Sequence, residues 1–436
     1  MGLNHNDKIQ AYINQVCSQV RFRDVHQDIR LELETHINEA IEEYLSQGSS
    51  EEEAIKKAIA QMGDPETIGK ELNQVHKPKP DWIVLLLSFL FINIGLLAMY
   101  IIQKQGLLPP IQIFNRSLFF SFVGVVTIIG LYFFDYRKLE KYSKHIYLGT
   151  LLLLIYTILF GRQVSGSRAW LNIGPFSINF VANSPLLFIV AFAGLFNNWN
   201  WSKSFKLLQG LALLGMPLLL YLAAPSLSTG VIYIVACMVL MFISGAKFKE
   251  IASIPVSFLT ILTLAVLMEP YRLERLKNFF IFLNPENDPL GIGYLNVQLH
   301  KIITNSGLWG QGLTFKPRVL PELHTDFIFA FITYTFGWVG SILLITFVII
   351  FLIRIASIAR QVKLTYAKLL ISGVIAILSI QFLWNILMNL GLAPLSSVGL
   401  PFISYGGSQL FTNAITVGII LSIYRRRNIS QSCKLS

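Results

Sequence analysis

Hydrophobic and polar residues alternate differently in two parts of the chain. Between residues 7 and 75, apolar positions recur at helical spacing, with polar residues between them. The clearest series is Val25, Ile29, Leu33, Ile37 and Ile41. A single apolar stripe of this kind is typical of helices that pack against each other in water. The pattern therefore predicts a small soluble bundle of three or four helices over residues 1–76.

Two consecutive helices of this bundle have recognisable ends. Ser50 followed by Glu53 is the pattern of a capping box. Gly63 suits the end of one helix, whereas Asp64 and Pro65 suit the N-cap and first turn of the next. No set of catalytic residues is visible in residues 1–76, so we leave open whether they form a passive appendage or a regulatory or docking domain.

From residue 82 onward, apolar windows of about 20 residues recur, which is the length that crosses a bilayer as a helix. We therefore expect an all-α fold: a polytopic membrane protein with ten transmembrane helices, preceded by the soluble bundle. A linker at 77–81 joins the two parts, the membrane domain covers 82–427, and a tail follows at 428–436. The expected spans are 82–102, 117–135, 145–160, 183–197, 206–223, 229–245, 252–268, 325–353, 367–390 and 404–424.

Composition agrees with this division. The chain of 436 residues is 54% hydrophobic and 14% charged, with a mean hydropathy of +0.58, which is too apolar for an ordinary soluble protein. The first 80 residues are polar, so no signal peptide is expected. Three widely spaced cysteines, Cys17, Cys237 and Cys433, form neither a disulfide framework nor a metal-ligand pattern.

Charge is unevenly distributed along the chain. Residues 1–80 hold 9 Lys and Arg against 14 Asp and Glu, whereas the remainder holds 26 against 10. A basic excess in the apolar part favours membrane lipids or a phosphorylated substrate as partners, and we expect no nucleic acid. With the N-terminus inside, the inside loops carry 16 Lys and Arg and the outside loops 10. This bias predicts that both termini lie on the inner, cytoplasmic side of the membrane.

An acidic residue stands at the edge of one expected span. Glu322, His324 and Asp326 run directly into the apolar stretch 327–332, on the expected outer side. Asp326 could simply be a carboxylate that the dipole of a helix N-terminus favours. However, a partly desolvated carboxylate facing a cavity has a raised pKa and can act as a base near neutral pH.

Two outer segments could serve the same site. Arg168 and Trp170 lie two residues apart in the loop 161–179, although an interfacial Trp and a snorkelling Arg are also common. The loop 269–324 combines cations, aromatic residues and turn formers, and loops of this length are usually functional. The plain alternative is an interfacial lid whose cations contact lipid headgroups.

A third outer segment, residues 390–410, breaks an apolar run. Pro401, Gly406 and Gly407 interrupt it. Irregular backbone at membrane depth is tolerated only where protein or a cavity surrounds it. These breaks therefore predict the mouth of a cavity.

Five motifs follow one another within residues 82–427. They are "SGSRAWLNIGPFS" (165–177), "EPYRLERL" (269–276), "NPENDPLGIGYLNVQ" (284–298) followed by "SGLWGQGL" (306–313), "LPELHTDFIFAFI" (320–332) and "LPFISYGGSQLFTNAITVGIILSI" (400–423). Together they closely resemble the signature of the SEDS family, the FtsW/RodA/SpoVE peptidoglycan polymerases. Residues 1–80 lie outside this resemblance. They resemble the small cytoplasmic helical domains of HAAS type, with "MGDP" (62–65) as the recognisable piece.

The resemblance implies a glycosyltransferase that polymerises lipid II, the undecaprenyl-pyrophosphate disaccharide-pentapeptide, at the outer face of the bacterial cytoplasmic membrane. It also implies a partner, a class B penicillin-binding protein. The essential aspartate of the family motif corresponds to Asp326, which would act as the catalytic base, and the functionally important Trp to Trp170. The substrate-binding candidates are Trp170, Arg168, Arg272, Arg275, Lys316, His324, Gln298, Ser404, Gly406 and Gly407.

Neither residues nor resemblance identify a metal site. One carboxylate supplies too few ligands for a dedicated divalent ion, so no protein-bound metal is expected. A divalent cation could nevertheless enter together with the substrate pyrophosphate.

Several polar positions of the family are changed in this chain. Tyr334 and Thr335 occupy positions that are acidic in the family, Ser226 replaces an acid, and Ala169 replaces one of two arginines. The family's Gln-Pro-Ser-Glu stretch appears as residues 179–182. Two alternatives to an enzyme therefore stay open: a non-catalytic scaffold or regulator of the cell-wall machinery, and a lipid II flippase. The sequence does not distinguish division, elongation and sporulation roles.

Overall fold

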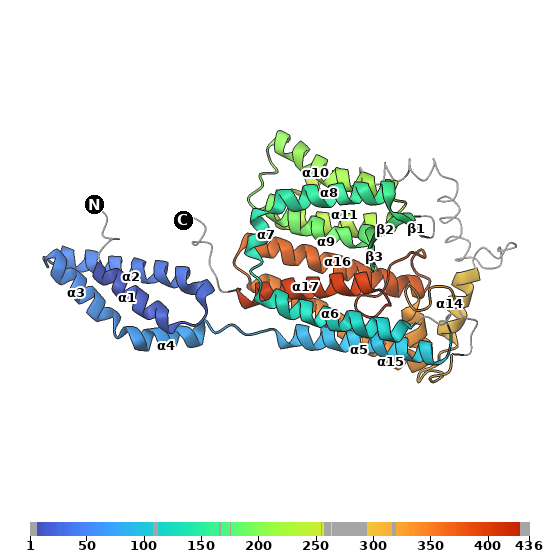
Figure 1. The fold of residues 1–436 in the computed structure, drawn as a ribbon. Helices are drawn as coiled ribbons and strands as arrows, with labels where there is room; N and C mark the ends of the chain where they lie inside the picture. The colour runs from blue at the N-terminus through green and yellow to red at the C-terminus, as the bar shows by residue number, and fades with distance from the viewer. Residues whose placement is uncertain are drawn as a thin grey trace. The chain divides into compact units, whose positions relative to one another are not determined.

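The structure is a computed structural model (Figure 1), and Figure 1 labels its helices and strands. It describes residues 7–107, 112–164, 167–174, 176–253, 255–256, 263, 294–315 and 320–427. The chain forms two compact units. The first contains residues 1–80 with 361–364 and 423–436, and the second contains residues 81–360 and 365–422.

The N-terminal unit is the expected helical bundle. Its elements are α1 (Asp7–Gln19), η2 (Arg23–Val25), α2 (His26–Ser46), α3 (Glu51–Met62) and α4 (Pro65–Val75). The helix α2 packs on α3, and α1 packs on α4. The predicted stripe is buried throughout, since Val25, Ile29, Leu33, Ile37 and Ile41 are at most 6% exposed. Burial of this stripe against the other helices supplies the main stabilisation.

The predicted helix ends are confirmed at Gly63, Asp64 and Pro65, whereas the predicted capping box at Ser50 is wrong. The Asp64 carboxylate accepts hydrogen bonds from the Thr67 amide (2.9 Å) and hydroxyl (2.8 Å), which lower the pKa of Asp64. Ser50 is the N-cap residue of α3, but its side chain makes no capping hydrogen bond. Three exposed acids follow in the first turn of α3, Glu51, Glu52 and Glu53. The helix dipole favours negative charge there, so charge stabilises this end instead.

The second unit is a bundle of apolar helices. Among the described residues, seven helices are long and apolar enough to cross a membrane. They are α5 (Trp82–Lys104), α6 (Ile113–Phe133), α8 (Ser143–Phe160), α10 (Ser204–Ala223), α15 (Ile328–Gln361), α16 (Thr365–Asn389) and α17 (Gly407–Arg425). The apolar helices α9 (Phe180–Leu195) and α11 (Leu227–Ile243) are shorter. These nine helices match nine of the ten predicted spans, and the tenth, 252–268, falls largely outside the described residues.

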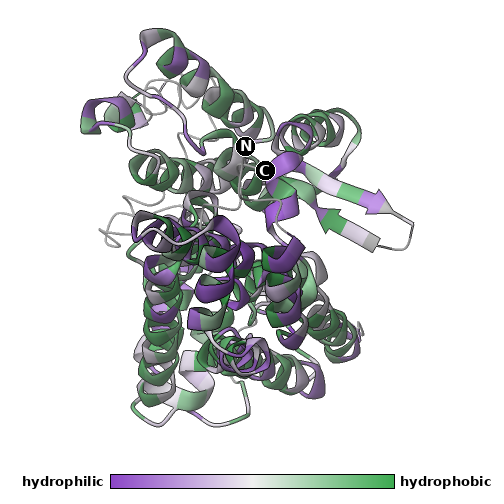
Figure 2. Cartoon of the chain, turned by 90° about the vertical axis from the view of Figure 1, so that its left-hand side faces the viewer, coloured by the Kyte–Doolittle hydropathy of each residue, from purple (hydrophilic) through white to green (hydrophobic). Residues whose placement is uncertain are grey.

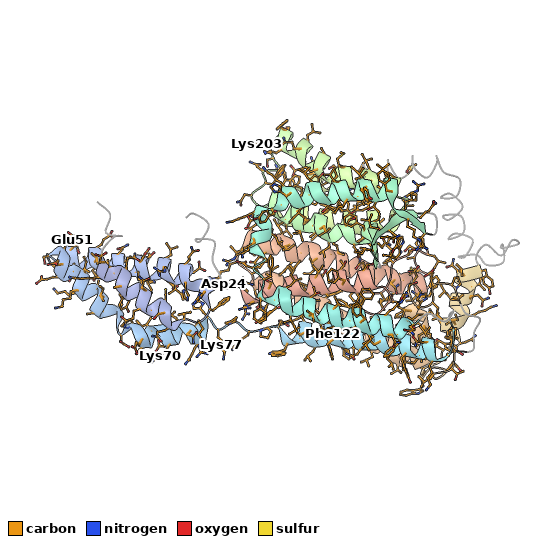
Figure 3. The ribbon with its side chains drawn as sticks, in the orientation of Figure 1. Asp24, Glu51, Lys70, Lys77, Phe122 and Lys203 are labelled. Atoms are coloured by element: carbon orange, nitrogen blue, oxygen red, sulfur yellow. The ribbon has the colours of Figure 1, made fainter. Side chains whose placement is uncertain are left out.

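Large apolar side chains face outward on several of these helices. Phe122 of α6, labelled in Figure 3, is 69% exposed, and Leu86 of α5 is 65% exposed. Figure 2 colours long stretches of the helices as hydrophobic. In a bilayer such residues contact lipid, whereas in water they would cost free energy. The helix α16 packs against both α9 and α11.

One segment that was expected to be an irregular loop is a small sheet. Strands β1 (Arg162–Val164), β2 (Ser167–Ile173) and β3 (Phe176–Asn179) form an antiparallel sheet in the order β1-β2-β3. The sheet packs against α8 and α9. Strand pairing satisfies backbone groups that a bare loop would have to leave to water. The structure also contains two short helices, α7 (Arg137–Lys141) and α14 (Tyr294–Thr304).

The helix α15 is broken near its start. Gly337 has φ 74° and ψ −177°, so the helix consists of a short piece, 328–336, and a long piece, 338–361. The long piece measures about 36 Å, which is enough to cross the bilayer alone. The glycine-rich segment 307–312 lies against the break. The Gly307 carbonyl accepts a hydrogen bond from the Trp338 amide (3.1 Å), and the Gln311 amide donates one to the Tyr334 carbonyl (2.8 Å).

Candidate active site

A tight turn at residues 321–327 leads into α15 and contains Asp326. Glu322 has a left-handed backbone, with φ 56°. Its carbonyl accepts from the amides of Thr325 (3.1 Å), Asp326 (3.0 Å) and Phe327 (3.2 Å). The Thr325 hydroxyl also donates to the Glu322 carboxylate (2.7 Å). These bonds hold the two carboxylates of the turn close to each other.

The segment 400–405 holds the backbone of this turn through hydrogen bonds. The Tyr405 amide donates to the His324 carbonyl (2.9 Å). The Ser404 hydroxyl donates to the Thr325 carbonyl (2.6 Å) and accepts from the Leu400 amide (2.7 Å). The segment 400–405 therefore donates hydrogen bonds to the successive carbonyls of His324 and Thr325. The structure thus places two predicted candidates, Ser404 and His324, beside Asp326.

Two asparagines of α16 hold the backbone carbonyl of Asp326, the third carbonyl of the turn to be fixed by another segment. Asn385 and Asn389 both donate their side-chain amides to the Asp326 carbonyl, at 3.0 Å and 3.1 Å. Both asparagines are buried, at 0% and 1% exposure. They are absent from the sequence-based candidates. A signal existed, since two amides four residues apart share one face of an otherwise apolar span.

Electrostatics at this turn favour the protonated form of the acid. Burial, together with a smaller effect of the nearby Glu322 charge, raises the pKa of Asp326 to about 7. Burial lowers the pKa of His324, against a smaller opposing effect of Glu322. Near neutral pH, Asp326 is therefore divided between its two forms, while His324 is neutral. This is the condition that a general base requires.

His324 packs beside an aromatic ring. Its ring centroid lies 5.2 Å from that of Tyr405. Within the described part of the chain, its Nδ1 atom is buried without a hydrogen-bond partner. A neutral imidazole with a spare nitrogen can accept or donate one hydrogen bond to a substrate group.

The predicted glycines lie at a small cavity. Ser404, Gly406 and Gly407 line it together with residues of α5 and α6. Gly407 begins α17, and a Cβ atom there would overlap the ring of Phe120. Gly407 thus permits α17 and α6 to approach closely, and the segment 400–407 borders a cavity, as its irregular sequence predicted.

Two predicted substrate-binding residues, Arg168 and Trp170, lie on strand β2 and contact residues other than those of the Asp326 turn. Arg168 is exposed, and its guanidinium donates to the Leu159 carbonyl (3.3 Å). Trp170 is half-buried and pairs with Asn179 across β2 and β3. Figure 1 shows the sheet and α14 at the same end of the second unit. Gln298, on α14, is half-buried.

Three predicted cations cannot be placed. Arg272, Arg275 and Lys316 fall outside the described residues. Among the residues that the structure does describe, no group of three or more His, Cys, Asp or Glu side chains could hold a metal ion. The two cysteines described, Cys17 and Cys237, are free and buried.

Comparison with known proteins places this site in a family. The sequence profile of the FtsW/RodA/SpoVE family, described as cell cycle proteins, matches residues 81–429. The HAAS profile matches residues 12–71. Stage V sporulation protein E of Bacillus subtilis is 29% identical over 364 residues, which cover 80% of this chain and 98% of that protein. Peptidoglycan glycosyltransferase MrdB of Escherichia coli is 30% identical over 360 residues, covering 80% and 94%.

Solved structures show the same fold. A chain from a structure titled "Structural coordination of polymerization and crosslinking by a peptidoglycan synthase complex" superposes with a TM-score of 0.67 at 24% identity, covering 80% of this chain and 98% of that one. The rod shape determining protein RodA of Thermus thermophilus gives 0.61 at 20% identity, with the same coverage. The chain belongs to the FtsW/RodA/SpoVE family and carries a HAAS domain at its N-terminus.

Proposed function

We propose that this protein is a peptidoglycan glycosyltransferase that polymerises lipid II at the outer face of the cytoplasmic membrane. The observation that carries the proposal is Asp326 itself: α16 and the segment 400–405 hold the backbone of its turn, and the pKa of its buried carboxyl is raised to about 7. Relatives that this chain matches over nearly their whole length are named peptidoglycan glycosyltransferases. One of them is RodA of Treponema pallidum, which is 27% identical over 430 residues.

Asp326 would act as the general base. Its carboxylate accepts the proton of the acceptor sugar hydroxyl, whose oxygen attacks the anomeric carbon of the donor. The bond from that carbon to the pyrophosphate breaks, and the lipid pyrophosphate leaves. Both substrates are anchored in lipid, so a base at the start of a membrane helix lies at the depth where their headgroups meet.

The leaving group needs positive charge. Arg168 is exposed on the sheet, and Arg272, Arg275 and Lys316 belong to the same expected outer side, so we assign pyrophosphate binding to these cations. Trp170, Gln298 and His324 would contact the sugars or the peptide. A divalent ion would enter bound to the pyrophosphate, because the described residues offer it no separate cluster.

We extend the proposal to topology and partner. Loop charges favour both termini in the cytoplasm, which puts Asp326 outside. The partner would be a class B penicillin-binding protein; a similar chain comes from a peptidoglycan synthase complex that coordinates polymerization and crosslinking, which supports a partner of this kind. Residues 1–76 would serve regulation or docking.

One observation favours a second candidate, a non-catalytic scaffold. Tyr334 and Thr335, at positions where the family carries acids, are only 5% and 4% exposed and belong to the break in α15. These positions serve packing here, so fewer polar groups are left for a substrate. The base and its supporting bonds remain, which is why we prefer the enzyme.

The test is polymerisation of purified lipid II by the detergent-solubilised full-length protein, with and without a class B penicillin-binding protein. Asp326→Asn should reduce the product at least a hundredfold, while Asp64→Asn, a matched change in the soluble bundle, should leave it unchanged. A folded wild-type protein that makes no polymer with any such partner would support the scaffold instead. Full activity in Asp326→Asn would remove this residue as the base.

A further inference from the structure

The start of α15 lacks the cap that its own sequence would normally supply. The first helical hydrogen bond of α15 runs from the Phe331 amide to the Phe327 carbonyl (3.2 Å), so Phe327 occupies the N-cap position. An N-cap side chain usually accepts from the second or third amide of the helix. A phenyl ring cannot do so, and the third amide, that of Ala330, needs another acceptor.

Asp326 is the nearest acid in sequence, but it does not serve this purpose. Across the residues that the structure describes, no hydrogen bond reaches the Asp326 carboxylate. The acceptor is Asn389 of the neighbouring helix α16, whose Oδ1 atom accepts from the Ala330 amide (3.3 Å). A residue distant in sequence therefore caps α15.

The same asparagine also holds Asp326 through its nitrogen. Its Nδ2 atom donates to the Asp326 carbonyl (3.1 Å) and to the Asn385 carbonyl (2.8 Å). Asn385 repeats the arrangement, with its Nδ2 donating to the Asp326 carbonyl (3.0 Å) and to the Val398 carbonyl (2.7 Å). Side-chain amides suit this task because each combines two donors with an acceptor.

We propose that Asn389 and Asn385 are positioning residues for Asp326: Asn389 caps α15 in place of the aspartate, and both amides fix its carbonyl, so that its carboxylate stays available for the reacting hydroxyl. The proposal rests on the polymerase function proposed above. In this arrangement α16 caps α15 and holds the turn, and the turn supplies the carboxylate that reacts.

The titration of Asp326 can reveal whether its carboxylate caps α15, because few charged or titratable groups among the described residues surround it. Glu322 and His324 lie on its own turn, Tyr405 is the titratable group contributed by the segment 400–405, and the α16 contacts are neutral amides. If Asp326 took over the cap, its carboxylate would accept a backbone amide. Such a bond stabilises the charged form and lowers the pKa.

Two substitutions at position 389 should affect the titration of Asp326 differently. Asn389→Leu removes the acceptor for Ala330, so Asp326 should turn to the helix and its midpoint should fall by about one pH unit. Asn389→Asp keeps an acceptor and adds a negative charge, so the midpoint should stay near 7 or rise. The readout is site-specific labelling of Asp326 by a hydrophobic carbodiimide, which modifies protonated carboxyls, followed across pH by mass spectrometry.

Polymerisation of lipid II supplies the second readout. Asn389→Leu and Asn385→Leu should slow the reaction at least tenfold, because a displaced base loses its alignment. The control is Thr157→Val in α8, which removes an equally buried hydroxyl that bonds the Leu153 carbonyl of its own helix. The control should change neither readout.

The two readouts separate failure of this inference from failure of the proposed function. An unchanged labelling midpoint in folded Asn389→Leu, or rates within twofold of wild type, would overturn the positioning role. If wild type makes no polymer, the function fails, but labelling still decides whether the asparagines govern Asp326. Should Asn389→Leu not fold, Asn389→Asp and Asn385→Leu carry the test, and a midpoint below that of wild type in Asn389→Asp would contradict it.

Discussion

At the scale of single residues, Asp326 depends on its neighbours for its chemical state. Burial is the larger cause of its raised pKa, and Glu322 adds to it. The two carboxylates are kept together by the left-handed turn at Glu322. A base with a pKa of about 7 combines adequate basicity with a substantial ionised fraction at neutral pH.

Replacing Glu322 should shift the pH dependence of polymerisation. Glu322→Gln removes the negative charge that raises the pKa of Asp326, so the rising limb of the rate should move to lower pH. The shift should be smaller than one unit, because burial remains the larger cause. The glutamine can still accept the Thr325 hydroxyl bond. A shift to higher pH would contradict the assignment.

The raised pKa also has a consequence for stability. The unfolded value is about 4, so Asp326 contributes stability that is fully present below pH 4 and is lost as the pH rises through about 7. Asparagine does not titrate. The melting temperature of Asp326→Asn relative to wild type, measured in detergent, should therefore be higher at pH 8 than at pH 5. An equal difference at both pH values would mean that the acid is not desolvated.

At the scale of elements, the break in α15 depends on two glycines that face each other. Gly337 and Gly310 both have positive φ, of 74° and 82°. A Cβ atom on Gly337 would overlap the Leu308 carbonyl oxygen, and one on Gly310 would overlap that of Thr335. The segment 307–312 thus joins the two pieces of the helix that follows Asp326.

Alanine at this break should be costly. Gly337→Ala combines a strained backbone with a steric overlap, which costs about 1–3 kcal/mol or more. We expect a melting temperature lower by several degrees and slower polymerisation. Gly149→Ala in α8 is the matched control, because its Cβ atom would meet open space and alanine favours helix. Equal melting temperatures for the two variants would show that the break is not needed.

Another element-scale lesson concerns what sequence patterns can reveal. Apolar windows predicted nine of the described helices, because length and hydropathy are local properties. The motif at 320–332 located the turn with Asp326, and the motif at 400–423 included Ser404, but the bond between them came only from the structure. The sheet at 162–179 and the break at Gly337 were missed, since both depend on pairing between segments. The capping role of Asn389 was missed for the same reason, as it joins residues 59 positions apart.

At the scale of the whole molecule, the chain combines two units of different chemistry. Residues 1–80, which hold 9 Lys and Arg against 14 Asp and Glu, form most of a helical unit. The core of this unit is made of side chains from α1, η2, α2 and α3 and the residues between them. The membrane unit contains every described candidate for catalysis. An ion pair stands where the membrane unit begins, since the buried Asp81 caps α5 and contacts Arg354 of α15 at 2.7 Å.

Removing the soluble bundle should spare the chemistry. Deletion of residues 1–76 keeps Asp81 and the whole turn at Asp326, so lipid II polymerisation by the purified protein should stay within about threefold of wild type. Localisation or regulation in cells should change instead. If the truncated protein fails to fold in detergent, the two units are not independent and this division of roles is wrong.

The most direct test of the central claim, that Asp326 is the base of a lipid II polymerase, is the rate of polymerisation measured from pH 5 to pH 9. The account predicts that the wild-type rate rises with pH and reaches half its maximum near pH 7, and that Asp326→Asn shows no such rise. A wild-type rate that is independent of pH in this range, or an equal rise in Asp326→Asn, would contradict it.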